Sequence, residues 1–150
     1  MTTGLGTNTV VQVGLIVRNI EKSIDAYMGI FDLTERPVAR ETESADVTNI
    51  KYRGETTPGR AKLAFIKMGQ VTIELIEPIG GPSTWQEFLD THGEGVHHLA
   101  FQVKGTQQVV SFLNGKGVPM VQQGDYKGGM YTYLDSAPQL GVILELLENF

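Results

Sequence analysis

Alternation of apolar and polar side chains is the main pattern in this chain, and it marks short segments separated by glycine, proline or polar residues. A period of two residues is typical of strands with one buried face. The expected strands are residues 10–17, 61–67, 71–77, 96–103, 130–134 and 142–147, with weaker candidates at 47–52 and 119–125. Residues 68–70 join the second and third strands as a hairpin. Most of the ordered backbone is therefore expected in strands.

Three other segments are expected to be helices. After Asn19, which can cap a helix N-terminus, apolar residues recur at helical spacing over residues 20–28. Residues 83–90 are expected to form a short connecting helix, and residues 106–115 a third one. Residues 36–59 are charged, rich in threonine and weakly patterned, so this segment is expected to be variable or mobile.

The order of these elements repeats along the chain. A strand, a helix and three strands lie between about residues 8 and 80, and the same order recurs between about residues 94 and 149. The closest match joins residues 73–77 and 144–148, where glutamate occupies the second and fifth positions of an apolar strand. The sequence therefore predicts a single α+β domain, residues 1–150, made of two βαβββ modules.

Two adjacent histidines, His97 and His98, lie within the expected strand 96–103. Because side chains alternate across a strand, the two rings are expected on opposite faces. His97 shares its face with three apolar residues, so we interpret it as a structural core residue. His98 shares the other face with small or polar residues and is the better candidate for a functional role.

Superposition of the two modules brings four polar side chains together. Gln12 falls opposite His98 in the first strands, and Glu74 falls opposite Glu145 in the fourth strands, each in mid-strand on the face away from the helix. A carboxylate buried in an apolar run costs several kcal/mol unless a positive group compensates it. These nitrogen and oxygen donors, in a chain without cysteine, suit a divalent cation such as Zn, Ni, Co, Mn or Fe.

Glu77 and Glu148 are nearby alternatives for the carboxylate pair. Each lies three residues after its counterpart, and therefore on the opposite face of its strand and close to the end of that strand. A solvated charge at such a position needs no ligand, so we expect both to be surface residues.

Composition narrows the class of protein. The chain has 150 residues with 12 basic and 17 acidic side chains, a net charge of −5 and no basic run, which argues against nucleic acid as a partner. The absence of cysteine excludes a disulfide framework, a thiolate metal site and a cysteine nucleophile. The N-terminal residues lack the basic and apolar parts of a targeting signal, and no apolar run reaches the roughly 20 residues that cross a bilayer. We expect a soluble cytoplasmic protein that does not bind membranes.

Taken together, these residues resemble the vicinal oxygen chelate superfamily, which includes glyoxalase I, methylmalonyl-CoA epimerase, fosfomycin-resistance proteins and extradiol dioxygenases. The segments that carry the resemblance are residues 12–23 with Tyr27, 62–65, 73–78, 93–101 and 141–146. Residues 62–103, with their double histidine, look most like bacterial methylmalonyl-CoA epimerases, whereas a Gln, Glu, His, Glu ligand set is similar to that of zinc-type glyoxalase I. With the repeat, the resemblance implies a curved eight-stranded mixed sheet around a central metal-binding cleft, helices on the outside, and a homodimer.

The resemblance also implies a reaction. In both subfamilies the metal polarises a carbonyl or binds an enediolate, so that a proton on the adjacent carbon can be removed at neutral pH. Glu145 is our candidate for the base, with Glu74 as its counterpart on the other side of the reacting carbon. Lys62, Tyr131 and Tyr133 belong to third strands and are candidate substrate contacts. The expected activity is that of a metal-dependent isomerase, epimerase or lyase acting on a small-molecule thioester or hemithioacetal.

Two alternatives stay open within the superfamily. An extradiol-type dioxygenase would hold iron with two histidines and one carboxylate, and Gln12 in place of a histidine argues against it. A binding protein of the bleomycin-resistance kind would sequester a small molecule without chemistry and would need no intact ligand set, whereas this chain keeps four candidate ligands.

Overall fold

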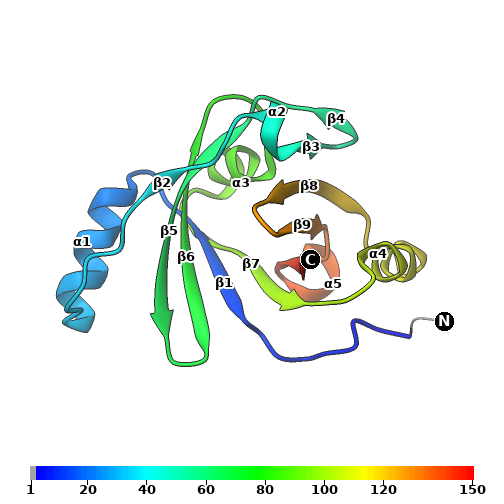
Figure 1. Cartoon of the computed structure of the whole chain (residues 1–150), viewed down its shortest axis with the longest axis horizontal. Helices are drawn as coiled ribbons and strands as arrows, with labels where there is room; N and C mark the ends of the chain where they lie inside the picture. The colour runs from blue at the N-terminus through cyan, green and yellow to red at the C-terminus, as the bar shows by residue number, and fades with distance from the viewer. Residues whose placement is uncertain (1–2) are drawn as a thin grey trace.

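Within residues 3–150, which the computed structural model describes, ten strands form one mixed sheet (Figure 1). The first two residues, part of the expected domain 1–150 and of the segment assessed for a targeting signal, lie outside this range. The strands are β1 (Gln12–Ile16), β2 (Arg40–Glu41), β3 (Lys51–Tyr52), β4 (Glu55–Thr56), β5 (Arg60–Met68), β6 (Val71–Ile79), β7 (Gly95–Gln102), β8 (Met120–Tyr126), β9 (Gly129–Leu134) and β10 (Ile143–Asn149). The helices are α1 (Ile20–Phe31), α2 (Ala45–Thr48), α3 (Thr84–His92), α4 (Thr106–Gly115) and α5 (Ala137–Leu140).

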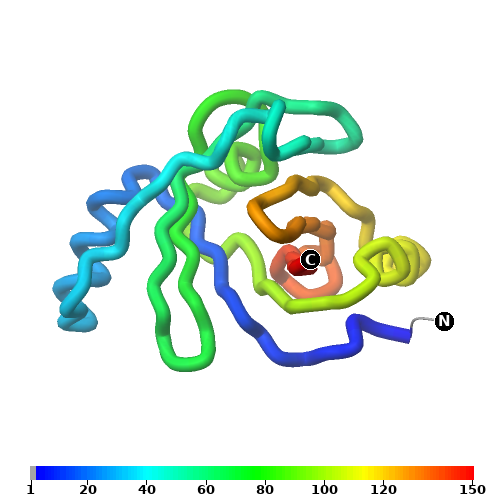
Figure 2. The backbone as a smooth tube through the Cα atoms, viewed as in Figure 1, coloured from blue at the N-terminus to red at the C-terminus, as the bar shows by residue number. Residues whose placement is uncertain are grey.

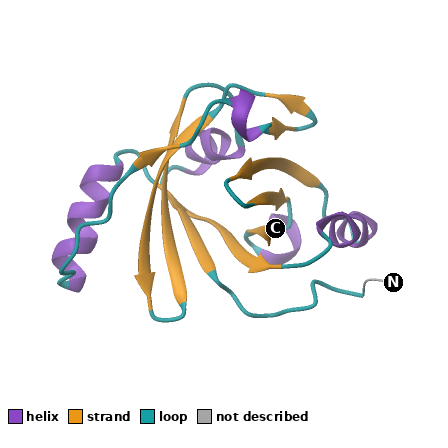
Figure 3. Cartoon of the chain, viewed as in Figure 1, coloured by secondary structure: helices purple, strands orange, loops and turns teal. Residues whose placement is uncertain are grey.

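The strand order brings the four strands that carry the predicted ligands to the centre of the sheet. This order is β2-β5-β6-β1-β7-β10-β9-β8-β3-β4. β1 and β7 are antiparallel neighbours, β1 pairs in parallel with β6, and β7 pairs in parallel with β10. Figure 3 shows the sheet curling, with α1 and α4 on its outer sides. The predicted curved mixed sheet with external helices is therefore present.

The strongly patterned strands and the three longer helices are confirmed, and Asn19 caps α1 by accepting from the backbone N–H of Lys22 at 3.1 Å. The sheet has ten strands rather than the expected eight, because residues 36–59 form three two-residue strands and α2 in place of one strand. Figure 2 shows this segment, in cyan, leaving α1 and crossing to the far end of the sheet, where β3 pairs with β8. Strands this short carry too few residues for alternation to reveal them.

Helices α1 and α4 cover the face of the sheet that points away from the predicted ligands. Ile24 of α1 lies in one buried cluster with Leu75 of β6, and Leu113 of α4 lies in another with Leu146 of β10. Leu75 and Leu146 each directly follow a predicted ligand, so alternation sends the ligand to the other face. Full burial of a leucine-sized side chain contributes about 1.5–3 kcal/mol, which fixes this choice of face. No helix within residues 3–150 is both long and apolar enough to cross a membrane.

Glu77 and Glu148 lie on the helix side of the sheet, as expected, but they are more than solvated surface charges. Glu77 Oε1 accepts from the backbone N–H of Ile20, the first residue of α1, at 2.8 Å. Glu148 accepts from the backbone N–H groups of Gly105 and Thr106, at the start of α4, at 3.0 and 2.9 Å. Each carboxylate satisfies N–H groups that the first turn of a helix leaves unpaired, and its charge opposes the helix dipole.

Glu148→Gln is expected to lower the midpoint of thermal unfolding by a few degrees at neutral pH, because the cap loses its charge. Hydrogen bonds from Thr106 and Gly105 lower the pKa of Glu148, so its stabilisation is present above the ordinary carboxyl pKa and is lost as the pH falls through the lowered value. The melting curves of variant and wild type, followed by circular dichroism, should therefore converge in acid. Glu55→Gln, at an exposed strand position, is the control; an equal effect of both variants at neutral pH would contradict the cap.

Candidate metal centre

Four polar side chains from the four central strands meet on the inner face of the sheet. The Nε2 atom of His98 lies 3.1 Å from Glu145 Oε1, 3.3 Å from Glu74 Oε1 and 3.1 Å from Gln12 Oε1. Glu74, His98 and Glu145 are buried, and one ligand atom from each lies within 4.8 Å of the others. The structure thus brings together all four residues predicted as ligands.

Gly14 makes room for the imidazole of His98. It lies on β1 between Glu74 of β6 and His98 of β7, its partners in the two neighbouring strands. A Cβ atom on Gly14 would collide with Cε1, Nδ1 and Nε2 of the ring. The absence of a side chain at Gly14 therefore lets the ring lie flat over β1 and reach the carboxylate on the next strand, a close-approach role typical of glycine in a strand.

A β-bulge at the double histidine breaks the predicted alternation. Gly14 pairs with His98 while Leu15 pairs with Val96, so His97 is an extra residue in β7. The Nδ1 atom of His97 lies only 2.9 Å from Nδ1 of His98. The expectation that the two rings would lie on opposite faces is therefore wrong, because a bulged residue does not follow the period of two.

His97 lies deep beside the centre. Its ring packs edge-on against Phe88 of α3 and Tyr133 of β9, with centroid separations of 5.5 and 5.1 Å. Its side chain is 1% exposed, and its Nε2 atom has no hydrogen-bond partner among the described residues. Burial, together with the neighbouring His98, lowers the pKa of His97 well below its ordinary value, so this ring is neutral.

The carboxylates control the charge of His98. Burial alone would lower its pKa, but the negative charges and hydrogen bonds of Glu145 and Glu74 outweigh burial and raise the pKa to about 10. Burial also raises the pKa of Glu74, and the hydrogen bond from His98 partly offsets this effect. Without metal, the imidazolium of His98 is therefore the positive group that compensates the buried carboxylates.

The donor set fits a divalent cation. The terminal atom of Gln12 that enters the cluster lies 2.8 Å from Glu145 Oε1 and 3.2 Å from Glu74 Oε1. As an oxygen it faces only acceptors, and as the amide nitrogen it would donate to them. A cation resolves this convergence of acceptors, because three oxygens and one imidazole nitrogen can then point at one positive charge. Such a set suits Zn, Ni, Co or Mn.

The centre lies in a cleft with a volume of about 880 Å³. Residues 36–59, which carried no clear pattern, supply part of its wall through β2, α2 and the residues beside them. Trp85 at the start of α3 closes another part, and it also escaped the sequence interpretation because a tryptophan in a short helix usually indicates packing alone. The wall residues from these two regions are Glu41, Thr42, Glu43, Val47, Thr48, Ile50, Gly59 and Trp85.

Tyr131 and Tyr133 line the same cleft. The indole N–H of Trp85 donates to the hydroxyl of Tyr133 at 3.0 Å, and the side-chain amide of Gln122 donates to the hydroxyl of Tyr131 at 3.1 Å. Burial raises the pKa of both phenols, so both hydroxyls stay protonated. Because an incoming N–H occupies a lone pair of each oxygen, each O–H remains available to donate.

Lys62 does not line the cleft. It is paired in register with Glu77 on the helix side of the sheet, and its Nζ lies 3.8 Å from Glu77 Oε2. The adjacent Leu63 faces the cleft instead. The assignment of Lys62 as a substrate contact fails because the side chains of β5 alternate, and its odd-numbered neighbours take the inner positions.

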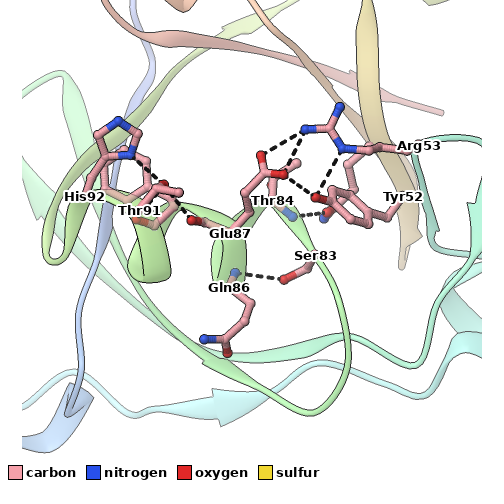
Figure 4. Close-up of polar contacts among 10 residues, drawn as sticks. Tyr52, Arg53, Ser83, Thr84, Gln86, Glu87, Thr91 and His92 are labelled. Atoms are coloured by element: carbon pink, nitrogen blue, oxygen red, sulfur yellow. Dashed lines mark hydrogen bonds and ion pairs between the residues drawn. The ribbon is translucent and has the colours of Figure 1, made fainter.

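Contacts between β3 and α3 hold the wall of the cleft in place (Figure 4). Glu87 of α3 accepts from the hydroxyl of Tyr52 at 2.6 Å and from the guanidinium of Arg53 at 2.8 and 3.0 Å. Ser83 caps α3 by accepting from the backbone N–H of Gln86 at 3.0 Å. Residues from a weakly patterned segment are thereby fixed to the helix that carries Trp85.

Comparison with known proteins identifies the family. A family model described as "Glyoxalase/Bleomycin resistance protein/Dioxygenase superfamily" matches residues 11–133, a range that holds three of the four residues of the centre. The chain belongs to this superfamily.

Within the superfamily, two curated relatives are similar to this chain. The "Uncharacterized protein YqjC" of Bacillus subtilis (strain 168) is 28% identical over 92 residues, which make up 59% of this chain and 66% of that protein, slightly under two thirds. The mitochondrial methylmalonyl-CoA epimerase of Dictyostelium discoideum is 23% identical over 149 residues, covering 97% of this chain and 81% of that protein.

Two solved structures share the fold. Methylmalonyl-CoA epimerase from Mycobacterium tuberculosis is 22% identical with a TM-score of 0.64, covering 100% of this chain and 93% of that one. A variant of methylmalonyl-CoA epimerase from Streptomyces coelicolor, in complex with 2-nitronate-propionyl-CoA, is 20% identical with a TM-score of 0.64, covering 95% and 94%. At these identities the likeness establishes the glyoxalase-type α+β fold.

Gly14→Ala should displace the His98 ring and weaken binding of Zn²⁺ by about 10–100-fold, the range seen when the support of a metal ligand is removed. Overpacking at this position should also lower the free energy of unfolding by about 1–3 kcal/mol. Competition with a chromophoric chelator measures the affinity. Gly29→Ala in α1, where an added Cβ meets nothing, is the matched control. Equal affinities of the two variants would contradict the steric role of Gly14.

Metal uptake should release a proton. Because the pKa of metal-free His98 is about 10, binding of Mn²⁺ should displace about one proton per ion between about pH 7 and 9, and less above about pH 10. The apparent affinity should rise with pH over the same interval. Calorimetric titrations in buffers of different ionisation enthalpy count the protons released. A count near zero at neutral pH would mean that His98 is already neutral before the metal binds.

Proposed function

We propose that this chain is a divalent-metal-dependent enzyme that removes a proton from the carbon next to a carbonyl group, as an isomerase, epimerase or lyase of a thioester or hemithioacetal. The observation that carries this proposal is the buried cluster of Gln12, Glu74, His98 and Glu145 beneath a mainly apolar cleft. Two carboxylates buried beside one imidazole are costly for folding alone, so a chemical role explains their presence.

The side chains around the cluster have separate roles in this reaction. A divalent cation held by the four residues would polarise the carbonyl of the substrate and acidify the adjacent C–H. Glu145 accepts the proton, and Glu74, on the other side of the imidazole of His98, can return one from the opposite face. Tyr131 and Tyr133 donate their hydroxyl protons to oxygen atoms of the substrate.

The lining of the cleft favours a substrate whose reacting end is apolar and carries little charge. Leu63, Phe65 and Leu147 contribute apolar surface, whereas Glu43 and Asp125 are exposed carboxylates at its edge. The phosphates of a CoA thioester would have to lie outside this acidic edge. Two observations support a thioester nonetheless: the names of the epimerase relatives, and the CoA analogue bound in a fold neighbour.

Other parts of the expectation remain proposals of the same kind. We infer that the domain consists of two βαβββ modules, about residues 8–80 and 94–149, and the matching pairs β1–β6 and β7–β10 support this division. A homodimer and a cytoplasmic location also stay predictions. A dioxygenase is less well supported, because the ligand cluster contains one histidine rather than two.

Exchange of solvent deuterium into 2-methylmalonyl-CoA and into the glutathione hemithioacetal of methylglyoxal, followed by NMR, tests the proposal. The metal-loaded wild type should label one of these substrates, and Glu145→Gln should reduce the rate by about 10²-fold or more while retaining much of the metal. Glu35→Gln, at an exposed loop position outside the cleft, should label at the wild-type rate. Absence of labelling of both substrates by the metal-loaded wild type would refute the proposed activity, leaving a binding protein. Exchange lost only in Glu74→Gln would assign the base to Glu74.

A further inference from the structure

His97 is a buried residue beside the metal centre to which the proposed reaction assigns no role. Its Nδ1 atom lies 2.9 Å from Nδ1 of His98, which is a hydrogen-bond distance. Only one of the two nitrogens can carry the proton between them. The direction of this hydrogen bond decides the tautomer of His98, and with it whether Nε2 of His98 has a lone pair for a cation.

The positions of the ring atoms determine this direction once a cation is bound. Nε2 of His98 points at the oxygen atoms of Gln12, Glu74 and Glu145, and its Nδ1 points at His97. A neutral imidazole that offers Nε2 to a cation carries its proton on Nδ1. We propose that His97 is a positioning residue: by accepting a hydrogen bond from His98 Nδ1–H, it holds His98 in the tautomer and orientation that present Nε2 to a divalent metal. This inference rests on the metal-binding part of the proposed function.

The surroundings of His97 suit an acceptor that must stay still. The β-bulge turns its ring toward His98, and Phe88 and Tyr133 hold the ring edge-on from two sides. Its Nε2 atom has no hydrogen-bond partner within the described residues, so the bond to His98 is the contact that determines which nitrogen carries the ring proton. Metal-bound histidines usually donate their second N–H to an oxygen acceptor or water, and here a neutral imidazole takes that place.

A purely structural role would require only the volume of the ring, and two variants separate the possibilities. In His97→Asn, Oδ1 lies close to the position of histidine Nδ1 and can accept the bond, whereas His97→Leu fills similar space without an acceptor. We expect His97→Leu to weaken Zn²⁺ binding by about 10–100-fold and His97→Asn to stay within about threefold of wild type. Competition with a chromophoric chelator gives both affinities, and circular dichroism reports whether each variant is folded. Wild-type affinity in His97→Leu, or equal losses in both variants, would overturn the proposal.

Nitrogen-15 NMR of the histidine rings provides a test that needs no variant. In the Zn²⁺-loaded wild type, the expected pattern is a protonated Nδ1 and metal-bound Nε2 for His98, with an unprotonated Nδ1 and protonated Nε2 for His97. A protonated Nδ1 on His97 would overturn the inference even if the protein catalyses deuterium exchange. If the protein binds Zn²⁺ but catalyses no exchange, the proposed activity fails, and the same spectra still decide the role of His97.

Discussion

Two carboxylates buried on the inner face of one sheet need a positive partner, and the centre of this molecule is arranged around that need. Glu74 and Glu145 lose hydration, and burial alone would favour their neutral forms. Without metal, the imidazolium of His98 supplies the charge, which is why its pKa rises to about 10 although the ring is fully buried. A divalent cation supplies more charge from the same place. The cluster can therefore exchange a proton for a metal without leaving its carboxylates unpaired.

Small residues on the central strands make this arrangement possible. Gly14 is the register partner of both Glu74 and His98, and Ala100 is the register partner of Glu145. Larger side chains at either position would fill the space that the polar groups share. The seam between β1 and β7 is thus a row of small residues beneath a ring of polar ones.

Much of the fold and all four candidate ligands could be predicted from the sequence, because each left a periodic signal. Glu74 and Glu145 stand out as charges inside apolar strands, and alternation alone sends Leu75 and Leu146 to the helices. His97 was misplaced because a bulge leaves no mark on the hydrophobic pattern. Lys62 was misplaced because belonging to a strand does not indicate which face a residue takes.

The cleft wall from residues 36–59 was missed for a different reason. Its strands contain two residues each, and its position depends on distant contacts such as Glu87 with Arg53 and Tyr52. Contacts across such sequence separations are not encoded in any local period.

The carboxylates that cap the two helices have a consequence for the accuracy of folding. On β6 and on β10, one glutamate points inward and a second, three residues later, points outward to an N-terminus of a helix. A slip of one residue in the pairing would turn Glu74 and Glu77 to each other's faces at once, exposing a helix end and emptying the centre. Misregistered chains would therefore lose a cap and a ligand together, so each strand checks its own alignment from both sides of the sheet.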